Sequence, residues 1–279
     1  MWWVPFLHTK IYESEEFNMN IAMLEGWTIT SLETVEAYDR TTHDCLIALD
    51  EVKNFSLKNT EDKSEVKGKG ENTLFIIKKN KGLTGDGTSG YVSGGLLTLQ
   101  TGNNAVEGDI SFRKREVKTV AKDATTVAIA ETASGTAGAE IVSLKATIGD
   151  TTTTYAQAVT ADATHFSYTN KTITLPTGIT GTVGGEIEVV YNYSKTGASI
   201  ANSADTYGKT VELILNCLGK NLCDEYYRIQ IVIPRADFNA NFDFAIGGDS
   251  TDHPFNFIGL VDKCSGEDKL WDFKVCKDA

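Results

Sequence analysis

Most of this chain alternates apolar and polar side chains with a period of two, the pattern of a β-strand that buries one face. Residues with high strand propensity, mainly Thr, Val, Ile, Tyr and Phe, fill most of these positions. The sequence therefore predicts an all-β protein. The predicted strands are Thr28–Tyr38, Asp44–Val52, Thr73–Lys79, Asp109–Lys118, Glu140–Ile148, Phe166–Leu175, Glu186–Tyr193, Thr210–Leu218, Tyr226–Ile233, Asn241–Ile246, Phe255–Val261 and Lys269–Val275.

One short segment departs from the alternating pattern and predicts a helix. Ser93 is suited to be its N-cap, and Gly102 is suited to end it. Leu96, Leu97 and Leu99 are expected to pack one face of this helix onto a sheet. The expected fold is a β-sandwich or partly closed barrel with one short flanking helix and an inserted β segment.

The inserted segment is predicted from a change in composition between residues 120 and 196. Thr, Ala and Gly dominate this region, and the run Gly149–Thr154 is of low complexity. Short alternating stretches continue through it, which fits either a small immunoglobulin-like sandwich or a pair of extended hairpins. The expected organisation is an N-terminal extension over 1–18, a β domain from 19–119 and 197–279, and the insertion 120–196.

The charge balance narrows the possible partners. The chain carries 26 Lys and Arg against 38 Asp and Glu, a formal net charge of −12. A protein that grips DNA needs basic residues to replace the counterions of the phosphates, so the acidity argues against a nucleic-acid groove. The longest apolar runs, such as Leu74–Ile77, are far shorter than the roughly 20 residues of a membrane helix. We therefore expect no membrane contact.

No motif in the chain predicts catalysis. The spacings HExxH, GxSxG and Walker-type do not occur. The triplet His43–Cys45 places a base near a possible nucleophile, but the alternation of strand residues favours a structural role. Gly248–Asp252 lacks an EF-hand pattern, and the cysteines are too widely spaced for the usual paired zinc ligands. We expect no enzyme, no metal and no cofactor. The cysteines considered are Cys217, Cys223, Cys264 and Cys276.

The segment Lys53–Asn72 is the first functional candidate. It is polar, mixed in charge and nearly free of core residues, and it predicts a long loop. Loops of this length without their own core usually serve binding or are disordered. The glycines of Gly68–Gly70 and Gly85–Gly87 are expected to be flexible turns, the latter within a Gly-rich turn over Gly82–Gly90.

The order of these segments resembles the major tail tube proteins of long-tailed bacteriophages. The resemblance includes a hairpin, a Lys/Glu loop ending in Gly-Lys-Gly, and Ser-Gly-Gly-Leu-Leu-Thr-Leu-Gln over Ser93–Gln100. Tyr227–Ala236 is similar to the family's strand that ends in an IP(K/R)A corner, and Val261–Phe273 to its terminal hairpin. The likeness covers roughly residues 20–119 and 205–276, while 120–195 departs from the minimal pattern.

This resemblance implies a structural virion protein. Six subunits would close into a ring, and stacked rings would form the conduit for DNA ejection, with an acidic lumen that lets DNA slide. The implied partners are further copies of the chain, the tape measure and tail terminator proteins, and passing DNA without specific binding. The implied location is the virion tail, assembled in the host cytoplasm. The long loop would make inter-ring contacts through Lys53, Glu61, Asp62, Lys63, Glu65, Lys67 and Lys69.

Two other functions fit the pattern less well. A head decoration or neck protein could carry the insertion as an immunoglobulin-like module. A carbohydrate-binding β-sandwich would favour exposed aromatic side chains on one face, but the four tryptophans are divided between the two ends of the chain. These are Trp2, Trp3, Trp27 and Trp271.

Overall fold

A computed structural model of the chain describes residues 26–177, 179, 185–244, 252–263 and 268–277. This part is nearly all strand with one helix, which confirms the predicted fold class. The expected extension over 1–18 and Cys264 lie outside the described residues, as does most of Gly248–Asp252. The chain divides into two compact units, residues 1–102 with 202–279 (unit 1) and residues 103–201 (unit 2).

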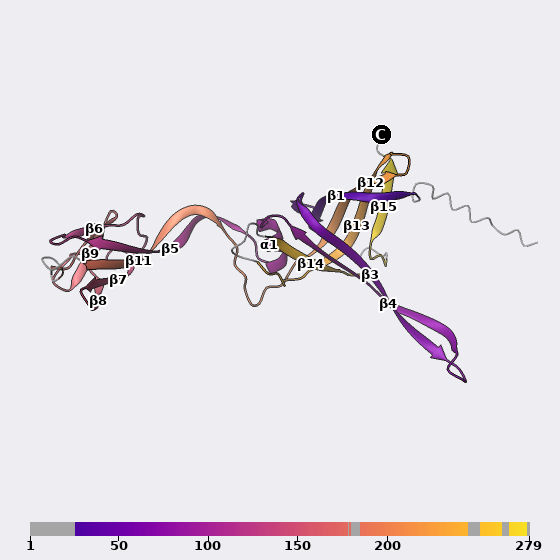
Figure 1. Ribbon diagram of the computed structural model, residues 1–279, viewed down its shortest axis with the longest axis horizontal. Coiled ribbons are helices and arrows are strands. Elements are labelled where there is room, and N and C mark those ends of the chain that lie inside the picture. The colour runs from indigo at the N-terminus through magenta and orange to yellow at the C-terminus, as the bar shows by residue number, and fades with distance from the viewer. Residues whose placement is uncertain (1–25, 178, 180–184, 245–251, 264–267, 278–279) are drawn as a thin grey trace, which may run out of the picture. The chain divides into compact units, whose positions relative to one another are not determined.

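Unit 1 contains one antiparallel sheet that nearly closes into a barrel (Figure 1). β1 also contacts β3, which stands at the far end of the strand order, so the two ends of the sheet approach each other. Of the two forms expected from the sequence, a sandwich or a partly closed barrel, the sheet of unit 1 has the barrel-like one. The order is β2 (Cys45–Leu49), β1 (Trp27–Tyr38), β12 (Thr210–Asn221), β13 (Tyr226–Phe238), β14 (His253–Gly259), β4 (Thr73–Ser89) and β3 (Val52–Lys67), while β15 (Asp272–Lys277) also pairs with β13.

The alternating pattern of the central strands explains the core of unit 1. In β12, Leu213 and Leu215 are fully buried, and in β13 Ile229 and Ile233 are equally inaccessible. Their side chains meet on one face because neighbouring residues of a strand point to opposite sides. The intervening residues lie on the outer face of the sheet. The two faces therefore differ in chemistry as the sequence predicts.

Pro234 lies within β13, although the strand predicted from the sequence ends one residue earlier, at Ile233. The register between β12 and β13 shifts between the pairs Val211↔Ala236 and Leu213↔Ile233, so Pro234 occupies a bulge. A bulge tolerates proline because the missing N–H breaks no regular ladder bond. The expected strand over Asn241–Ile246 is wrong for residues 241–244, which have no regular structure, and 245–246 lie outside the described residues.

The predicted Gly-rich turn over Gly82–Gly90 is also wrong, because β4 runs through it to Ser89. Here the glycines make room for aromatic rings from β14. A Cβ atom built on Gly85 would lie 2.2 Å from Cζ of Phe257, and one on Gly87 would lie 2.7 Å from Cζ of Phe255. Glycine in a strand commonly marks such a close approach. Sequence alone could not distinguish this role from a turn.

The segment Lys53–Asn72 is not a loop, and this expectation is corrected as well. Residues up to Lys67 form β3, which pairs with β4 along most of its length. Gly68 and Asn72 close the connecting turn through a backbone hydrogen bond of 2.9 Å. The segment looked like a loop because it has few apolar residues, although Phe55 and Leu57 pack against the core of unit 1. A hairpin ladder is made by the backbone and can form with few apolar side chains.

Helix α1 (Gly94–Thr101) has the predicted caps. Ser93 Oγ accepts a hydrogen bond from the Leu96 amide at 3.2 Å. Gly102 adopts the left-handed conformation with φ 75°, and its N–H donates to the Thr98 carbonyl. Leu96 and Leu99 are fully buried in the unit 1 core, whereas Leu97 is half-buried. The buried side chains of Leu96 and Leu99 hold this short helix against the core of unit 1.

A buried histidine of β14 connects to both ends of this helix. His253 Nε2 lies 2.7 Å from Gln100 Oε1, and its Nδ1 accepts a hydrogen bond from the Ser93 amide at 3.3 Å. The accepting Nδ1 places the proton on Nε2, which donates to Gln100. Burial lowers the pKa of His253 to about 4, so the ring is neutral near pH 7.

Unit 2 is a second sheet with its own apolar core, which includes Phe166, Ile187 and Tyr191. Its strands pair antiparallel except β8 with β9, which are parallel. The threonine run of low complexity forms part of β8. The order is β5 (Val106–Val120), β11 (Gly185–Ser199), β7 (Ile141–Ile148), β8 (Thr151–Gln157), β9 (His165–Thr169), β10 (Thr172–Thr174) and β6 (Thr126–Ala128). The limits expected for an insertion, 120 and 196, fall at the end of β5 and within β11, and the domain boundaries stay a prediction.

A buried carboxylate stabilises one edge of unit 2. Glu116 accepts hydrogen bonds from the Tyr191 hydroxyl and from the Ala130 amide, and Lys118 Nζ lies 3.0 Å from it. Burial raises the pKa of Glu116, but these hydrogen bonds outweigh burial and lower it to about 2. Burial and Glu116 together raise the pKa of Tyr191 to about 12. The network fixes the chain after β6 against β5 and β11.

Candidate assembly surfaces

The β3–β4 hairpin extends beyond the sheet of unit 1 and is the most prominent surface feature of that unit (Figure 1). β14 pairs with β4 only from Leu83 to Ser89. Beyond Leu83, the described strands that border β4 reduce to β3 alone. We call residues 60–82 the distal hairpin. It is a two-stranded ribbon, and none of its residues belongs to the buried core.

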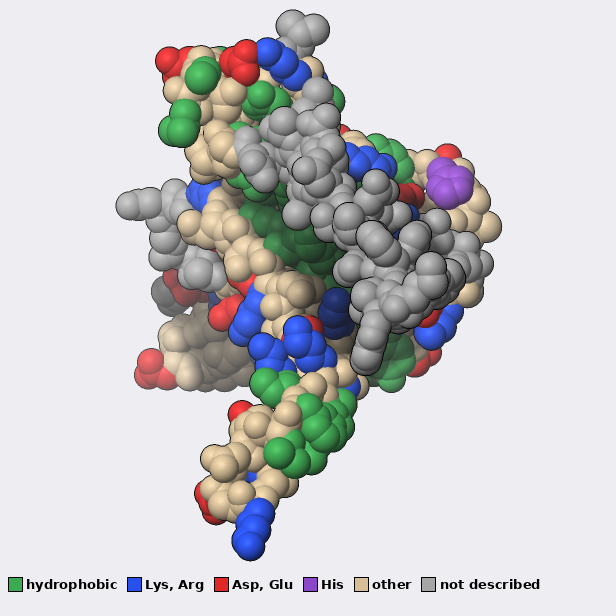
Figure 2. Space-filling view, turned by 90° about the vertical axis from the view of Figure 1, so that its right-hand side faces the viewer, with side chains coloured by type: hydrophobic (Ala, Val, Ile, Leu, Met, Phe, Trp, Pro, Cys, Tyr) green, Lys and Arg blue, Asp and Glu red, His purple; other side chains and the backbone are tan. Residues whose placement is uncertain are grey.

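The β4 strand of the distal hairpin exposes four consecutive apolar side chains. Leu74, Phe75, Ile76 and Ile77 are 65%, 55%, 50% and 46% exposed. Successive residues point to opposite faces, so both faces of this strand are apolar. Hydrophobic side chains cover much of the projecting hairpin in Figure 2. Single exposed apolar residues are common, but a contiguous patch usually marks an interaction site.

The charged residues singled out from the sequence lie mainly on the β3 side of this ribbon. Glu61 Oε1 is 3.6 Å from Lys78 Nζ and 4.0 Å from Lys63 Nζ. These pairs are solvent-exposed and contribute about 0–1 kcal/mol. Lys53 lies at the base of the hairpin, with Nζ 3.3 Å from Asp252 Oδ1. The distal hairpin contains the other six: Glu61, Asp62, Lys63, Glu65, Lys67 and Lys69.

Leu74–Ile77 is not among the site residues predicted from the sequence, although these residues lie in a predicted strand. A short apolar run is normally a buried strand. The available signal was its position between two lysine-rich segments, which a core strand rarely has. The roles of the seven charged residues in contacts remain a prediction.

The distal hairpin also differs in charge from the rest of the chain. It contains six lysines and four acidic residues, a net charge of +2, whereas the remaining residues carry −14. Lys78, Lys79 and Lys81 follow the apolar run directly. A basic, apolar ribbon therefore projects from an otherwise acidic protein.

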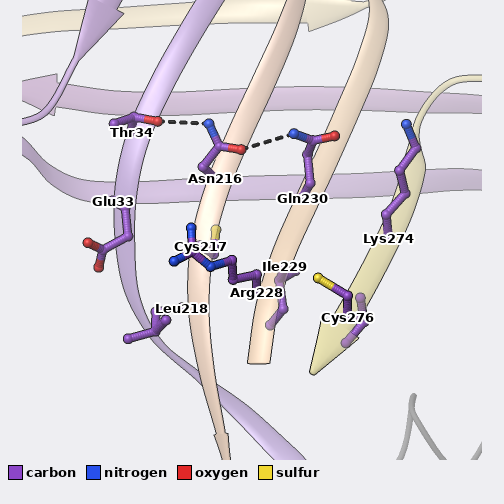
Figure 3. A pocket seen from close by; sticks show the side chains of 11 residues that line it. Glu33, Thr34, Asn216, Cys217, Leu218, Arg228, Ile229, Gln230, Lys274 and Cys276 are labelled. Atoms are coloured by element: carbon purple, nitrogen blue, oxygen red, sulfur yellow. Dashed lines mark hydrogen bonds between the residues drawn. The ribbon is translucent and has the colours of Figure 1, made fainter. Parts of the chain in front are cut away.

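The outer face of the unit 1 sheet forms a second surface, which is polar. Asn216 Nδ2 donates to Thr34 Oγ1 at 2.9 Å, and Gln230 Nε2 donates to Asn216 Oδ1 at 3.1 Å. Figure 3 shows these side chains in a row across β1, β12 and β13. Glu36 extends the row, and its hydrogen bond with Tyr38 raises the pKa of that hydroxyl to about 12. The row ties three strands together on the face opposite the core.

An open groove of about 700 Å³ adjoins this row (Figure 3). Apolar side chains such as Leu218 and Val275 line it together with the charged Glu33, Arg228 and Lys274. Cys217 also lines the groove, and burial raises the pKa of its thiol to about 11. A thiol held protonated in this way is a poor nucleophile.

The geometry around the other reactive side chains fits structural roles. His43 Nδ1 faces Glu212 at 3.9 Å, while Cys45 Sγ contacts the Ile47 carbonyl. The four described cysteines are free. Within the described ranges, no three metal-ligating side chains come together, and no helix has the length and apolar character needed to cross a membrane.

Comparison with known proteins places the chain in a family. A search of curated proteins found no match. The model of the YomU/Tube protein family matches residues 27–268, which include nearly all described strands of both units. This match confirms the resemblance to phage tail tube proteins that the sequence pattern predicts. The chain belongs to the YomU/Tube protein family.

Proposed function

We propose that this protein is a major tail tube subunit that closes into six-membered rings, and that stacked rings form the conduit for DNA ejection. The observation that carries the proposal is the distal hairpin. An isolated two-stranded ribbon is at best marginally stable in water, so an extended and exposed ribbon is best explained by a partner. Membership of the YomU/Tube protein family supports a structural role in the virion tail and argues against an enzyme.

The mode of assembly follows from the asymmetry of the subunit. The distal hairpin is basic and the rest of the chain is acidic, so charge favours a contact between the hairpin of one copy and a different surface of the next, which is a heterologous contact. Heterologous contacts generate rings where the rotation closes and filaments where it does not. A tube of stacked rings needs one contact that closes, within each ring, and one that does not close, between rings. The charges of β3, including Glu61, Lys63 and Glu65, would fix the register between rings, since charge pairs supply specificity more than affinity.

The charge distribution supports the role of a conduit. The chain outside the distal hairpin carries −14, and an acidic wall repels the phosphates of passing DNA. The partners in this proposal are further copies of the chain, the tape measure and tail terminator proteins, and DNA that passes without specific binding. Assembly would take place in the host cytoplasm.

Electron microscopy of the purified protein tests this function directly. Mass photometry on the same sample, at low and high concentration, measures the assembly state. We expect rings or tubes with a central channel, with six subunits per ring. A protein that stays monomeric at high concentration would overturn the proposal. Monomers that decorate added capsids would support the head-decoration alternative instead.

A further inference from the structure

We propose that the outer edge of β4 in the distal hairpin, residues 73–79, is a strand-addition site that a second copy of this chain occupies. Leu74, Phe75, Ile76 and Ile77 would be buried in that contact. The inference rests on the proposed self-assembly and deepens it. It moves the contact from the charged strand β3 to the apolar strand β4, and it assigns the backbone a part in the interface.

The two edges of the ribbon are chemically different. The β3 edge carries Glu61, Asp62, Lys63, Glu65 and Lys67 among its residues, and charged side chains commonly block unwanted strand pairing. The β4 edge has no charged residue from Thr73 to Ile77. Natural proteins protect long apolar edges unless these edges are used. Charged residues run along β3, but on β4 they begin only at Lys78, after the apolar run. The uncharged stretch from Thr73 to Ile77 is therefore the part of the ribbon edge that is open to a partner.

The exposed fractions of its side chains show that the described part of the chain leaves this edge uncovered. Leu83, at the base of β4, is 1% exposed and belongs to the unit 1 core. Ile77, only six residues earlier in the same strand, is 46% exposed. The strand thus passes from a core position to an open one, while its pairing with β3 continues on one side. The backbone groups on the other side face no described strand.

Charge complementarity identifies the occupant as another copy of the chain. The distal hairpin carries +2 and the rest of the molecule −14, so the hairpin of one copy is attracted to the body of the next. Within unit 1 the segment 27–51 alone has six acidic residues against one arginine. Main-chain hydrogen bonds would supply affinity, and the apolar side chains would supply the buried area.

Three single substitutions distinguish this contact from other possibilities. Ile76→Lys places a charge on the β4 edge, and Ser64→Lys places the same charge on β3, where Ser64 pairs with Ile77. Val159→Lys changes a side chain of unit 2 that is 78% exposed and serves as the matched control. Circular dichroism and thermal unfolding of each variant monitor the fold, which should be unchanged because Ile76 and Val159 are exposed and Ser64 is only half-buried.

Mass photometry and electron microscopy then measure assembly of the full-length variants. We expect Ile76→Lys to raise the concentration for half-assembly by about tenfold or more, the size of a contact hot spot. Ser64→Lys should change it much less, and Val159→Lys not at all. Equal assembly of Ile76→Lys and the unchanged protein would overturn the β4 contact, as would a larger effect of Ser64→Lys.

Hydrogen exchange tests the backbone part of the inference. The amides of residues 73–79 should exchange quickly in the monomer and become protected on assembly. If the unchanged protein assembles and these amides stay unprotected, strand addition is wrong although the tube function stands. If the unchanged protein never assembles, the proposed function itself fails. The two failures are therefore distinguishable.

Discussion

Two β ribbons of this protein extend beyond the sheets that anchor them, and they differ in how their apolar side chains are packed. In the distal hairpin, the apolar side chains lie on β4 and the charged ones mainly on β3. In unit 2, β11 pairs with β7 only up to Tyr191, and from Asn192 it continues with β5 alone. In this second ribbon, side chains of β5 interact with side chains of β11. Phe112 stacks on Tyr193 with ring centroids 5.7 Å apart.

The unit 2 ribbon therefore satisfies its side chains internally. Arg113 Nε donates to Asn192 Oδ1, and Thr196 donates to Asp109 Oδ1. Cross-strand pairs of this kind stabilise a ribbon by about 0.2–1 kcal/mol each. The distal hairpin also has cross-strand pairs, namely Thr73–Glu65, Asn80–Asp62 and Lys78–Glu61. These pairs join polar side chains only, whereas the aromatic rings of the unit 2 ribbon stack on each other. The exposed apolar run of the distal hairpin therefore fits the contact that we propose.

Removal of the distal hairpin should have the largest effect. A variant in which a two-residue Asn-Gly turn replaces residues 62–79 keeps the base of the hairpin and all core residues of unit 1. We expect loss of rings and tubes, with thermal unfolding of unit 1 nearly unchanged. Electron microscopy and calorimetry measure the two quantities. Normal tubes from this variant would remove the distinction between the ribbons.

A substitution at the base of the hairpin should instead lower the stability of unit 1. Gly85→Ala places a methyl group against the Phe257 ring, where a Cβ has only 2.2 Å. We expect a loss of about 1–3 kcal/mol in the free energy of unfolding, as is typical of overpacking. Denaturant unfolding measures it. Gly94→Ala is the control because nothing lies within 4 Å of that Cβ. Equal stability of the two variants would contradict the close approach.

Acid should weaken the two units in different pH windows. The folded pKa of His253 is about 4 against an ordinary 6.5, so the unfolded chain binds a proton first and unit 1 loses stability as pH falls from 6.5 towards 4. The folded pKa of Glu116 is about 2 against 4.5, so its contribution is lost between pH 4.5 and 2.

Hydrogen exchange of α1 and of residues 129–133 reports these two windows separately. A Glu116→Gln variant should lack the lower window and retain the upper one. Loss of protection in α1 only below pH 4 would argue against the neutral histidine.

Phe112→Ala should have the smallest effect and should be confined to unit 2. An aromatic pair contributes about 0.5–1.5 kcal/mol, and Phe112 is 42% exposed, so the expected loss lies near the lower end. Thermal unfolding measures it, while mass photometry should show unchanged assembly. Impaired assembly would mean that the unit 2 ribbon also contacts a partner.

Local signals predicted much of this fold. Strands β1, β12 and β13 were predictable from the alternation of apolar and polar residues, and the caps of α1 from Ser93 and Gly102. These features depend on a few neighbouring residues. The family resemblance also followed from the order of such segments. The predicted loop and the Gly-rich turn failed because long-range pairing decides both. A polar segment becomes a strand when a partner lies beside it, and glycine enters a strand when a ring needs its space.

The candidate contact surface shows the same division. The amino-acid sequence by itself determined that Leu74–Ile77 form an apolar strand and that lysines follow it. Only the tertiary structure decided that this strand leaves the sheet at Leu83 and carries its apolar side chains into solvent. The physical reason is that burial depends on which strands stop and which continue. That is set by the pairing of β4 with β14, whose residues are far away in the chain.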